Sequence, residues 1–108
     1  LQTALRNSTY VVAAWREGQL IGLARALSDD VAIVYIQDIL VRPEAQRSGV
    51  GRALLAHLLE RFGHVRSAVL LTDDDEAQLR FYASLGFMNT RDLVKIPLNA
   101  FVRMPGLE

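Results

Sequence analysis

The stretch QRSGVGRALL, residues 46–55, decides the fold of this chain. Gly49 and Gly51 stand on either side of Val50, and an apolar run of helical character follows them at once. A helix leaves its first backbone N–H groups without partners, and these groups carry partial positive charge. Small residues ahead of them let an anion approach the backbone closely. The stretch therefore predicts a phosphate cradle, or else a tight strand-to-helix turn that needs glycine for its backbone angles.

The side chains around the glycines can add to a phosphate cradle. Ser48, Arg47 and Arg52 supply hydrogen-bond donors of the kind that bind phosphate. Two familiar nucleotide loops do not fit, however. A P-loop ends in Gly-Lys-Ser/Thr, whereas Gly51 is followed by Arg52 and Ala53. A dinucleotide-binding fingerprint needs a third glycine, and Leu54 stands in its place.

Hydrophobic periodicity predicts a mixed α/β chain with the element order β-β-β-α-β-α-β. The expected strands are 10–15, 19–27, 31–41, 65–72, 87–90 and 93–98, the first two forming a hairpin. The expected helices start at Ala53 and near Glu76, and residues 1–8 are interpreted as the end of an earlier helix. In the first of these helices one stripe is apolar, namely Leu54, Leu55, Leu58, Leu59 and Phe62. In the second the stripe is Ala77, Phe81 and Leu85.

The turns between these elements carry their own signals. Gly63 is placed to cap the first long helix, and Gly86 to stop the second. Asp73, Asp74 and Asp75 precede the second helix, where they are expected to cap it, with cation binding as the alternative interpretation. The segment 31–72 forms a β-α-β unit, for which a right-handed crossover is expected.

Composition bounds the classes of protein that the chain can belong to. Its 108 residues predict a single domain over 1–108, and none of them is cysteine, which excludes disulfides, thiolate metal sites and a cysteine nucleophile. The formal net charge is zero, so no nucleic-acid partner is predicted. The absence of cysteine fits the cytoplasm, where we expect the protein. No apolar run reaches the length of a membrane span. His57 and His64 are interpreted as surface residues, so no metal is expected.

Two motifs together resemble the GNAT N-acetyltransferase superfamily. VRPEAQRSGVGRALL (41–55) is similar to the family's motif A, in which Gln46, Gly49 and Gly51 match the three key positions. FYASLGF (81–87) is similar to its motif B. The resemblance covers roughly residues 5–98 and implies an antiparallel meander followed by β-α-β-α-β around a central splayed sheet. The strand and first helix that usually open the family, and that help to form the acceptor pocket, have no counterpart in this chain.

The resemblance also implies a cosubstrate and the residues that hold it. Acetyl-CoA would be held by its pyrophosphate on the loop of Gln46, Arg47, Ser48, Gly49, Val50, Gly51 and Arg52. Its pantetheine arm would enter a splay at Ile39, Leu40 and Val41, where a free backbone N–H polarises the thioester carbonyl. Asp75 stands where the family often has a cofactor-contacting Asn. Tyr82 would point its hydroxyl at the cofactor sulfur and donate to the departing thiolate.

Asp38 is the candidate general base, because it interrupts an apolar strand next to Gln37. Its carboxylate can take a proton from the amine directly or through water, cap a local turn, or lie solvated at the sheet edge. The sequence leaves these alternatives open. A covalent mechanism is not expected, because the chain has no Gly-x-Ser-x-Gly elbow.

Three functions follow from these features. The leading hypothesis is an acetyl-CoA-dependent N-acetyltransferase that acts on a small-molecule or protein amine by direct attack. The second is a non-catalytic acyl-CoA-binding or sensing module, and the third is a structural or dimerisation domain. Apolar residues near the C-terminus predict a homodimer; they are Ile96, Leu98, Phe101 and Val102.

Overall fold

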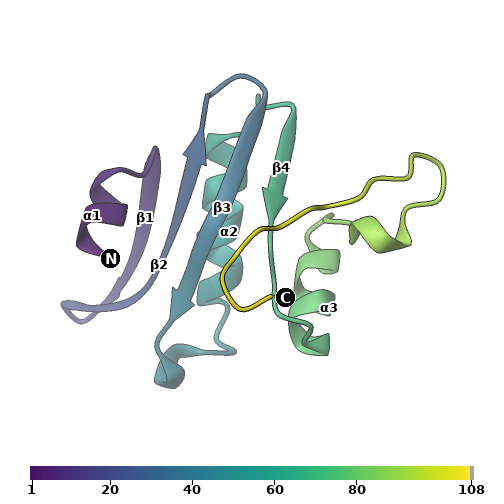
Figure 1. Cartoon of the computed structure of the whole chain (residues 1–108). Helices are drawn as coiled ribbons and strands as arrows, with labels where there is room; N and C mark the ends of the chain where they lie inside the picture. The colour runs from purple at the N-terminus through teal and green to yellow at the C-terminus, as the bar shows by residue number, and fades with distance from the viewer. Residues whose placement is uncertain (108) are drawn as a thin grey trace. The chain divides into compact units, whose positions relative to one another are not determined.

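The computed structural model describes residues 1–107. The chain forms two compact units, residues 1–71 and the residues from Thr72 onward. The first unit holds α1 (Gln2–Arg6), β1 (Tyr10–Arg16), β2 (Gln19–Ser28), β3 (Ile33–Val41), α2 (Val50–Arg61) and β4 (Ser67–Leu70), with a short 3-10 helix, η1 (Pro43–Ala45) (Figure 1). The second holds α3 (Glu76–Ser84) and a 3-10 helix, η2 (Thr90–Asp92). No helix within 1–107 has the length and apolar character that a membrane crossing requires.

The four strands form one sheet in the order β1-β2-β3-β4. β1, β2 and β3 pair antiparallel as a meander, whereas β3 and β4 pair in parallel through the α2 crossover. The predicted mixed sheet is therefore confirmed. β3 begins at Ile33 and not at residue 31, because the Asp29 carboxylate accepts the N–H groups of Val31, Ala32 and Ile33. Val31 and Ala32 are thereby held in the turn that leads into the strand at Ile33.

α2 covers one face of the sheet, as Figure 1 shows, and its apolar stripe builds the core. Of the predicted stripe, Leu54, Leu55, Leu58 and Phe62 are buried. They pack against alternate residues of the strands, since successive strand residues point to opposite faces. On β2 and β3 the buried residues include Ala24, Ala26, Val34 and Ile36. The helix fixes the position of the glycine loop because it is anchored to the sheet along its length.

The ends of α2 differ from the sequence prediction. The helix begins at Val50, not at Ala53, because Gly49 takes the N-cap position. It ends with Phe62 as the C-cap, and Gly63 does not adopt the left-handed conformation of a glycine cap. The buried ring of Phe62 holds this end on the core, so Gly63 is not needed for the cap.

The second unit confirms α3 but not the strands expected after it. α3 ends as predicted before Gly86, where the Gly86 N–H bonds the Ala83 carbonyl and the Phe87 N–H bonds the Tyr82 carbonyl. The predicted strands 87–90 and 93–98 are wrong. In the first, the Asn89 side chain accepts the Arg91 N–H and starts η2. In the second, Pro97 lacks a ladder donor, and Val94 and Ile96 are exposed.

Candidate functional site

The central strand β3 parts from β4 halfway along its length. Their parallel pairing runs from Ile33–Ser67 to Ile36–Leu70 and stops there. β3 continues to Val41 and stays paired with β2 on its other side. The three residues at which the sequence predicts the splay, Ile39, Leu40 and Val41, all lie beyond the last β4 pair. Residues 37–41 of β3 thus have a strand neighbour on one side only.

The hydrogen-bond pattern shows which backbone groups face the β4 side of this segment. The Arg42 N–H donates to the Ile21 carbonyl of the β2 side at 2.8 Å. In an antiparallel ladder the residues alternate, so Leu40 bonds β2 while Ile39 and Val41 turn their backbone groups away from it. The Gln46 side chain agrees with this, since its Nε2 donates to the Val41 carbonyl at 3.0 Å. The N–H groups of Ile39 and Val41 are therefore the candidates for polarising a carbonyl.

The loop between β3 and α2 is held by its own side chains. Gln46 is tied to the end of β3, and the Ser48 hydroxyl donates to the Ala45 carbonyl of η1. Both groups were predicted to contact a phosphate, and both are used here to shape the loop. Arg47 has a φ of 65° and Gly49 a φ of 90°, so the loop passes twice through the left-handed region. Only glycine adopts that region without steric cost.

The first turn of α2 is open to an anion. Its first intrahelical bond runs from the Ala53 N–H to the Gly49 carbonyl at 3.0 Å. The N–H groups of residues 50–52 therefore have no acceptor within the helix. No side chain caps them and no acidic residue lies in the first turn. A Cβ placed on Gly49 would meet no atom within 4 Å. With Arg47 and Arg52 alongside, this end of α2 combines partial positive charge with free approach.

Gly22 of β2 brings this end of the helix close to the sheet. A Cβ at Gly22 would lie 3.1 Å from the Leu40 carbonyl oxygen and equally close to side-chain carbons of Val50 and Leu54. The first turn of α2 thus rests directly on β2. Sequence reasoning missed Gly22, because a single glycine in an apolar strand does not reveal what approaches it.

The candidate base, Asp38, is engaged in an ion pair. Its Oδ2 accepts from the Arg25 Nε at 2.6 Å, and the two side chains are 26% and 13% exposed. Arg25 also donates from Nη1 to the Ser8 hydroxyl at 3.2 Å. The carboxylate thus neither caps a turn nor lies solvated at an edge. The sequence did not identify Arg25 as its partner.

Asp75 and Tyr82 belong to the second unit. Asp75 occupies the N-cap position of α3, as predicted, but its carboxylate makes no capping hydrogen bond. The Tyr82 ring packs edge-to-face on Phe81 at 5.1 Å and on Phe87 at 6.0 Å between ring centroids. Burial raises the pKa of Tyr82 above its ordinary value of 10. The hydroxyl therefore stays protonated at neutral pH, where it can donate a hydrogen bond.

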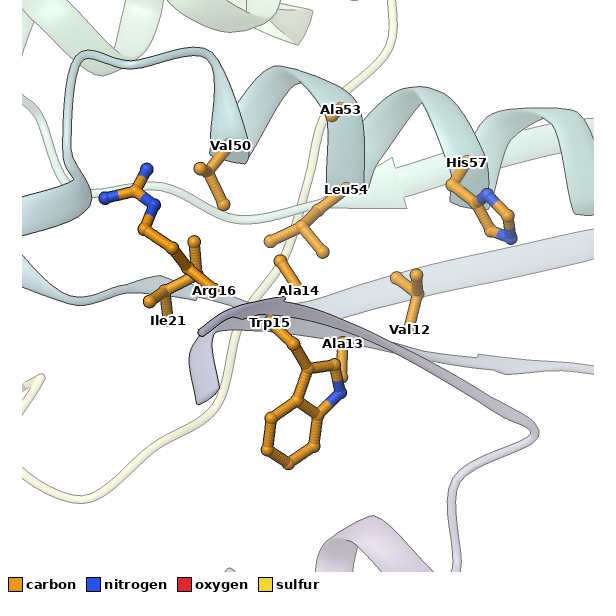
Figure 2. A pocket seen from close by; sticks show the side chains of 10 residues that line it. All are labelled: Val12, Ala13, Ala14, Trp15, Arg16, Ile21, Val50, Ala53, Leu54 and His57. Carbon is orange, nitrogen blue, oxygen red and sulfur yellow. The ribbon is translucent and has the colours of Figure 1, made fainter. Parts of the chain in front are cut away.

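A shallow groove of about 400 Å³ lies elsewhere in the first unit, between β1 and α2. Figure 2 shows Val50, Leu54 and His57 of α2 above it, with the Trp15 ring pointing away to the other side of β1. Its lining comes from β1, α2 and Ile21 and contains no acidic residue. The groove thus lies on the β1 side of α2, whereas the predicted splay lies between β3 and β4.

Both histidines are engaged by other side chains or by the backbone. The His57 ring nitrogen lies 3.1 Å from the Tyr10 hydroxyl, and that of His64 lies 3.1 Å from the Asp30 carbonyl. Over residues 1–107, no group of three or more His, Asp or Glu is arranged to hold a metal ion.

The site is thus a mixed sheet that opens beside a helix with glycine at its N-cap, and comparison with known proteins gives the class of domain. The Acetyltransferase (GNAT) family model matches residues 2–87. A GNAT family acetyltransferase from Streptococcus pneumoniae superposes with a TM-score of 0.79 and 30% identity, over 91% of this chain and 76% of that one. The chain belongs to the GNAT acetyltransferase family.

Curated relatives carry acetyltransferase names. The uncharacterized N-acetyltransferase ycf52 of Pyropia yezoensis is 26% identical over 99 residues, covering 88% of this chain and 57% of the relative. The histone acetyltransferase TAP1 of Glycine max is 35% identical over 99 residues, covering 81% of this chain and 42% of the relative. The chain spans about half the length of the curated relatives that it matches.

Proposed function

We propose that the protein is an N-acetyltransferase that moves the acetyl group of acetyl-CoA directly to a primary amine. The observation that carries the proposal is the open first turn of α2, with Gly49 in the left-handed region, next to the segment of β3 that has left β4. The family supports it, because relatives are named acetyltransferases. The absence of cysteine from the chain favours direct attack over a thioester on the protein.

In this proposal the first unit binds and orients the cosubstrate. The amide groups at the start of α2, with Arg47 and Arg52, hold the pyrophosphate. The space around Gly49, in which a Cβ would meet no atom within 4 Å, fits such a group. The N–H groups of Ile39 and Val41 orient and polarise the thioester carbonyl. Acetyl-CoA supplies an activated acyl carbon and a thiolate leaving group.

The second unit supplies Tyr82. We propose that its hydroxyl donates a hydrogen bond to the sulfur as negative charge develops there. Full proton transfer is unfavourable, since the ordinary pKa of a thiol is about 8.5 and burial raises the pKa of Tyr82 above 10. Tyr82 therefore acts as a hydrogen-bond donor, and the proton lost by the amine goes to solvent or to the thiolate.

A thiol-release screen tests the proposal. The protein is incubated with acetyl-CoA and a panel of amines, including amino acids, aminoglycoside-like polyamines and a lysine peptide, and free CoA is measured. A lysine peptide belongs in the panel because one relative is named a histone acetyltransferase. Release that depends on one class of amine, with mass-detected N-acetyl product, supports the proposal. Binding of acetyl-CoA with no release from any amine would instead favour a sensing module.

We also propose that the protein is a homodimer. Its C-terminal segment exposes Ile96 and Leu98 at 72% and 54%, and Phe101 and Val102 at 94% and 43%. A second copy would remove this apolar surface from water. Sedimentation of the protein at micromolar concentration tests this, and a mass near the 12.0 kDa of one chain would contradict it.

A further inference from the structure

Asp38 stands at a position of β3 that a regular strand would bury. Ser28–Val34, Leu27–Tyr35 and Ala26–Ile36 are successive pairs of β2 with β3. Continued without a break, this register would place Gln37 opposite Arg25 and Asp38 opposite Ala24. Ala24 lies on the face that α2 covers and has no exposed surface. A regular β3 would therefore drive a carboxylate into the apolar core, which is costly without a partner.

The observed register avoids this with a β-bulge. The pairing jumps from Ala26–Ile36 to Arg25–Asp38, so Gln37 is an extra residue without a partner on β2. The extra residue turns Asp38 to the sheet face opposite α2, where Arg25 meets it at 2.6 Å. Ile39, and not Asp38, then takes the place opposite Ala24. The bulged register thus keeps the Asp38 carboxylate out of the apolar core and pairs it with Arg25.

The bulge coincides with the point at which β3 leaves β4. Ile36 is the last residue of β3 paired with Leu70 of β4, and Gln37 follows it directly. A bulge bends its strand and increases the local twist. We propose that the Arg25–Asp38 ion pair fixes the bulge at Gln37 and so keeps Ile39–Val41 turned away from β4, open to the cosubstrate. Asp38 is thus a positioning residue. That this opening receives the cosubstrate rests on the proposed function.

The pair is also connected to α1. Arg25 donates to the Ser8 hydroxyl, which in turn donates to the Ala4 carbonyl of α1 at 2.8 Å. These bonds restrict the rotamers of Arg25, so its guanidinium is held ready for the carboxylate. Ser8→Ala should therefore disturb the bulge less than loss of Arg25 or Asp38 does, because the 2.6 Å bond between these two side chains remains.

The test replaces both charges by apolar side chains, in the double variant Arg25→Met/Asp38→Val. Replacing a largely buried pair by apolar groups often leaves stability unchanged or raises it, so the variant should fold. We expect the regular register, seen as NMR cross-strand contacts from Ala24 to position 38 instead of to Ile39. We expect acetyl-CoA to bind at least about tenfold more weakly, since misplacement by an ångström has effects of this size or larger, while the melting temperature does not fall.

Two matched variants separate the effect of the Arg25–Asp38 ion pair on the register from general effects of a lost charge. Asp38→Asn keeps a polar group that is costly to bury and still accepts from Arg25, so register and affinity should stay within about twofold of the parent. Arg61→Met removes the other close Arg–Asp pair of the first unit, with Asp30, and should leave both readouts unchanged. A double variant that keeps the Ala24–Ile39 contacts, or that keeps full affinity, would overturn the proposal. If the parent protein does not bind acetyl-CoA, the proposed function fails. The NMR contacts of the double variant then still test whether the ion pair fixes the bulge.

Discussion

The two units of the chain differ in how their residues are held. Every buried apolar residue of the described chain lies between Ile21 and Phe62, in the first unit. The second unit has one helix of nine residues, and none of the residues in that helix is buried. Three of its aromatic side chains are partly exposed, and among them Tyr82 contacts both Phe81 and Phe87.

Under the proposed function, this difference corresponds to separate tasks for the two units. The splay and the glycine loop need fixed backbone geometry, and they are placed on the strand and helix that build the core. Tyr82 has only to present one hydroxyl group, and a helix with a few ring contacts is sufficient for that. Changes in the first unit should therefore alter binding of the cosubstrate, whereas changes at Tyr82 should alter turnover.

Tyr82→Phe should give the largest effect. Removing the hydroxyl leaves the ring contacts with Phe81 and Phe87 in place but removes the donor to the thiolate. We expect turnover to fall more than about tenfold, because one such donor is commonly worth a factor of this size or larger. Acetyl-CoA affinity should hardly change. Steady-state kinetics and calorimetry measure the two quantities separately.

Tyr10→Phe is the matched control, because it removes a hydroxyl that bonds His57 in the first unit. It should leave turnover near that of the parent. Equal turnover in Tyr82→Phe and the parent, with a good acceptor, would mean that the second unit does not take part in the chemistry.

Gly49→Ala should reduce binding. A residue with a Cβ at a φ of 90° is strained by about 1–2 kcal/mol, and its relief would rotate the amide groups at the start of α2. Gly18→Ala provides the control, because Gly18 has a φ of 78° in the β1–β2 turn and open space around it. Both variants should lose similar stability on thermal unfolding. Only the first should lose acetyl-CoA affinity; equal losses of affinity would contradict the role of the loop.

Gly22→Ala should have a smaller effect on the same binding. The added methyl group would contact the Leu40 carbonyl, Val50 and Leu54 at 3.1 Å, so α2 must move by a few tenths of an ångström. We expect a loss of stability of about 1 kcal/mol and a few-fold weaker affinity. Chemical denaturation and calorimetry check the two values, and unchanged affinity would show that the cosubstrate tolerates a shift of the helix.

Much of the fold was predictable from local patterns. The meander, the α2 stripe and the end of α3 at Gly86 follow from periodicity and cap residues, and the structure has them. The strands expected at 87–90 and 93–98 failed, because the Asn89 side chain bonds the backbone locally and Pro97 lacks an N–H. Apolar composition alone does not make a strand when a side chain bonds the backbone locally or a proline lacks the N–H that pairing with another strand requires.

The candidate site was predictable only where a motif marks it. The motif located the glycine loop and Tyr82, but it did not reveal that Gln46 and Ser48 bond the loop's own backbone. Nor did it reveal Arg25, since only the bulge at Gln37 brings that residue opposite Asp38. Contacts that depend on a one-residue change of register are not visible in periodicity.

Asp29→Ala should give the smallest effect, and one that depends on pH. Hydrogen bonds from the N–H groups of Val31, Ala32 and Ile33 hold the pKa of Asp29 below its ordinary value of 3.8. A lowered pKa in the folded state means that the contribution to stability is present above pH 3.8 and is lost as the pH falls through the folded value. The variant should be less stable than the parent at pH 7, and the gap should narrow near pH 3. A gap that does not change with pH, in denaturation curves at both values, would contradict this.

A titration of the isotope-labelled protein with acetyl-CoA, followed by amide NMR, tests directly whether the cosubstrate binds at the splay and the glycine loop. We expect saturable shifts that are largest at residues 39–41 and 46–52, where β3 has left β4 and α2 begins. Saturable shifts confined to the β1–α2 groove, for example at Ala13 and His57, or no shifts at millimolar acetyl-CoA, would contradict it.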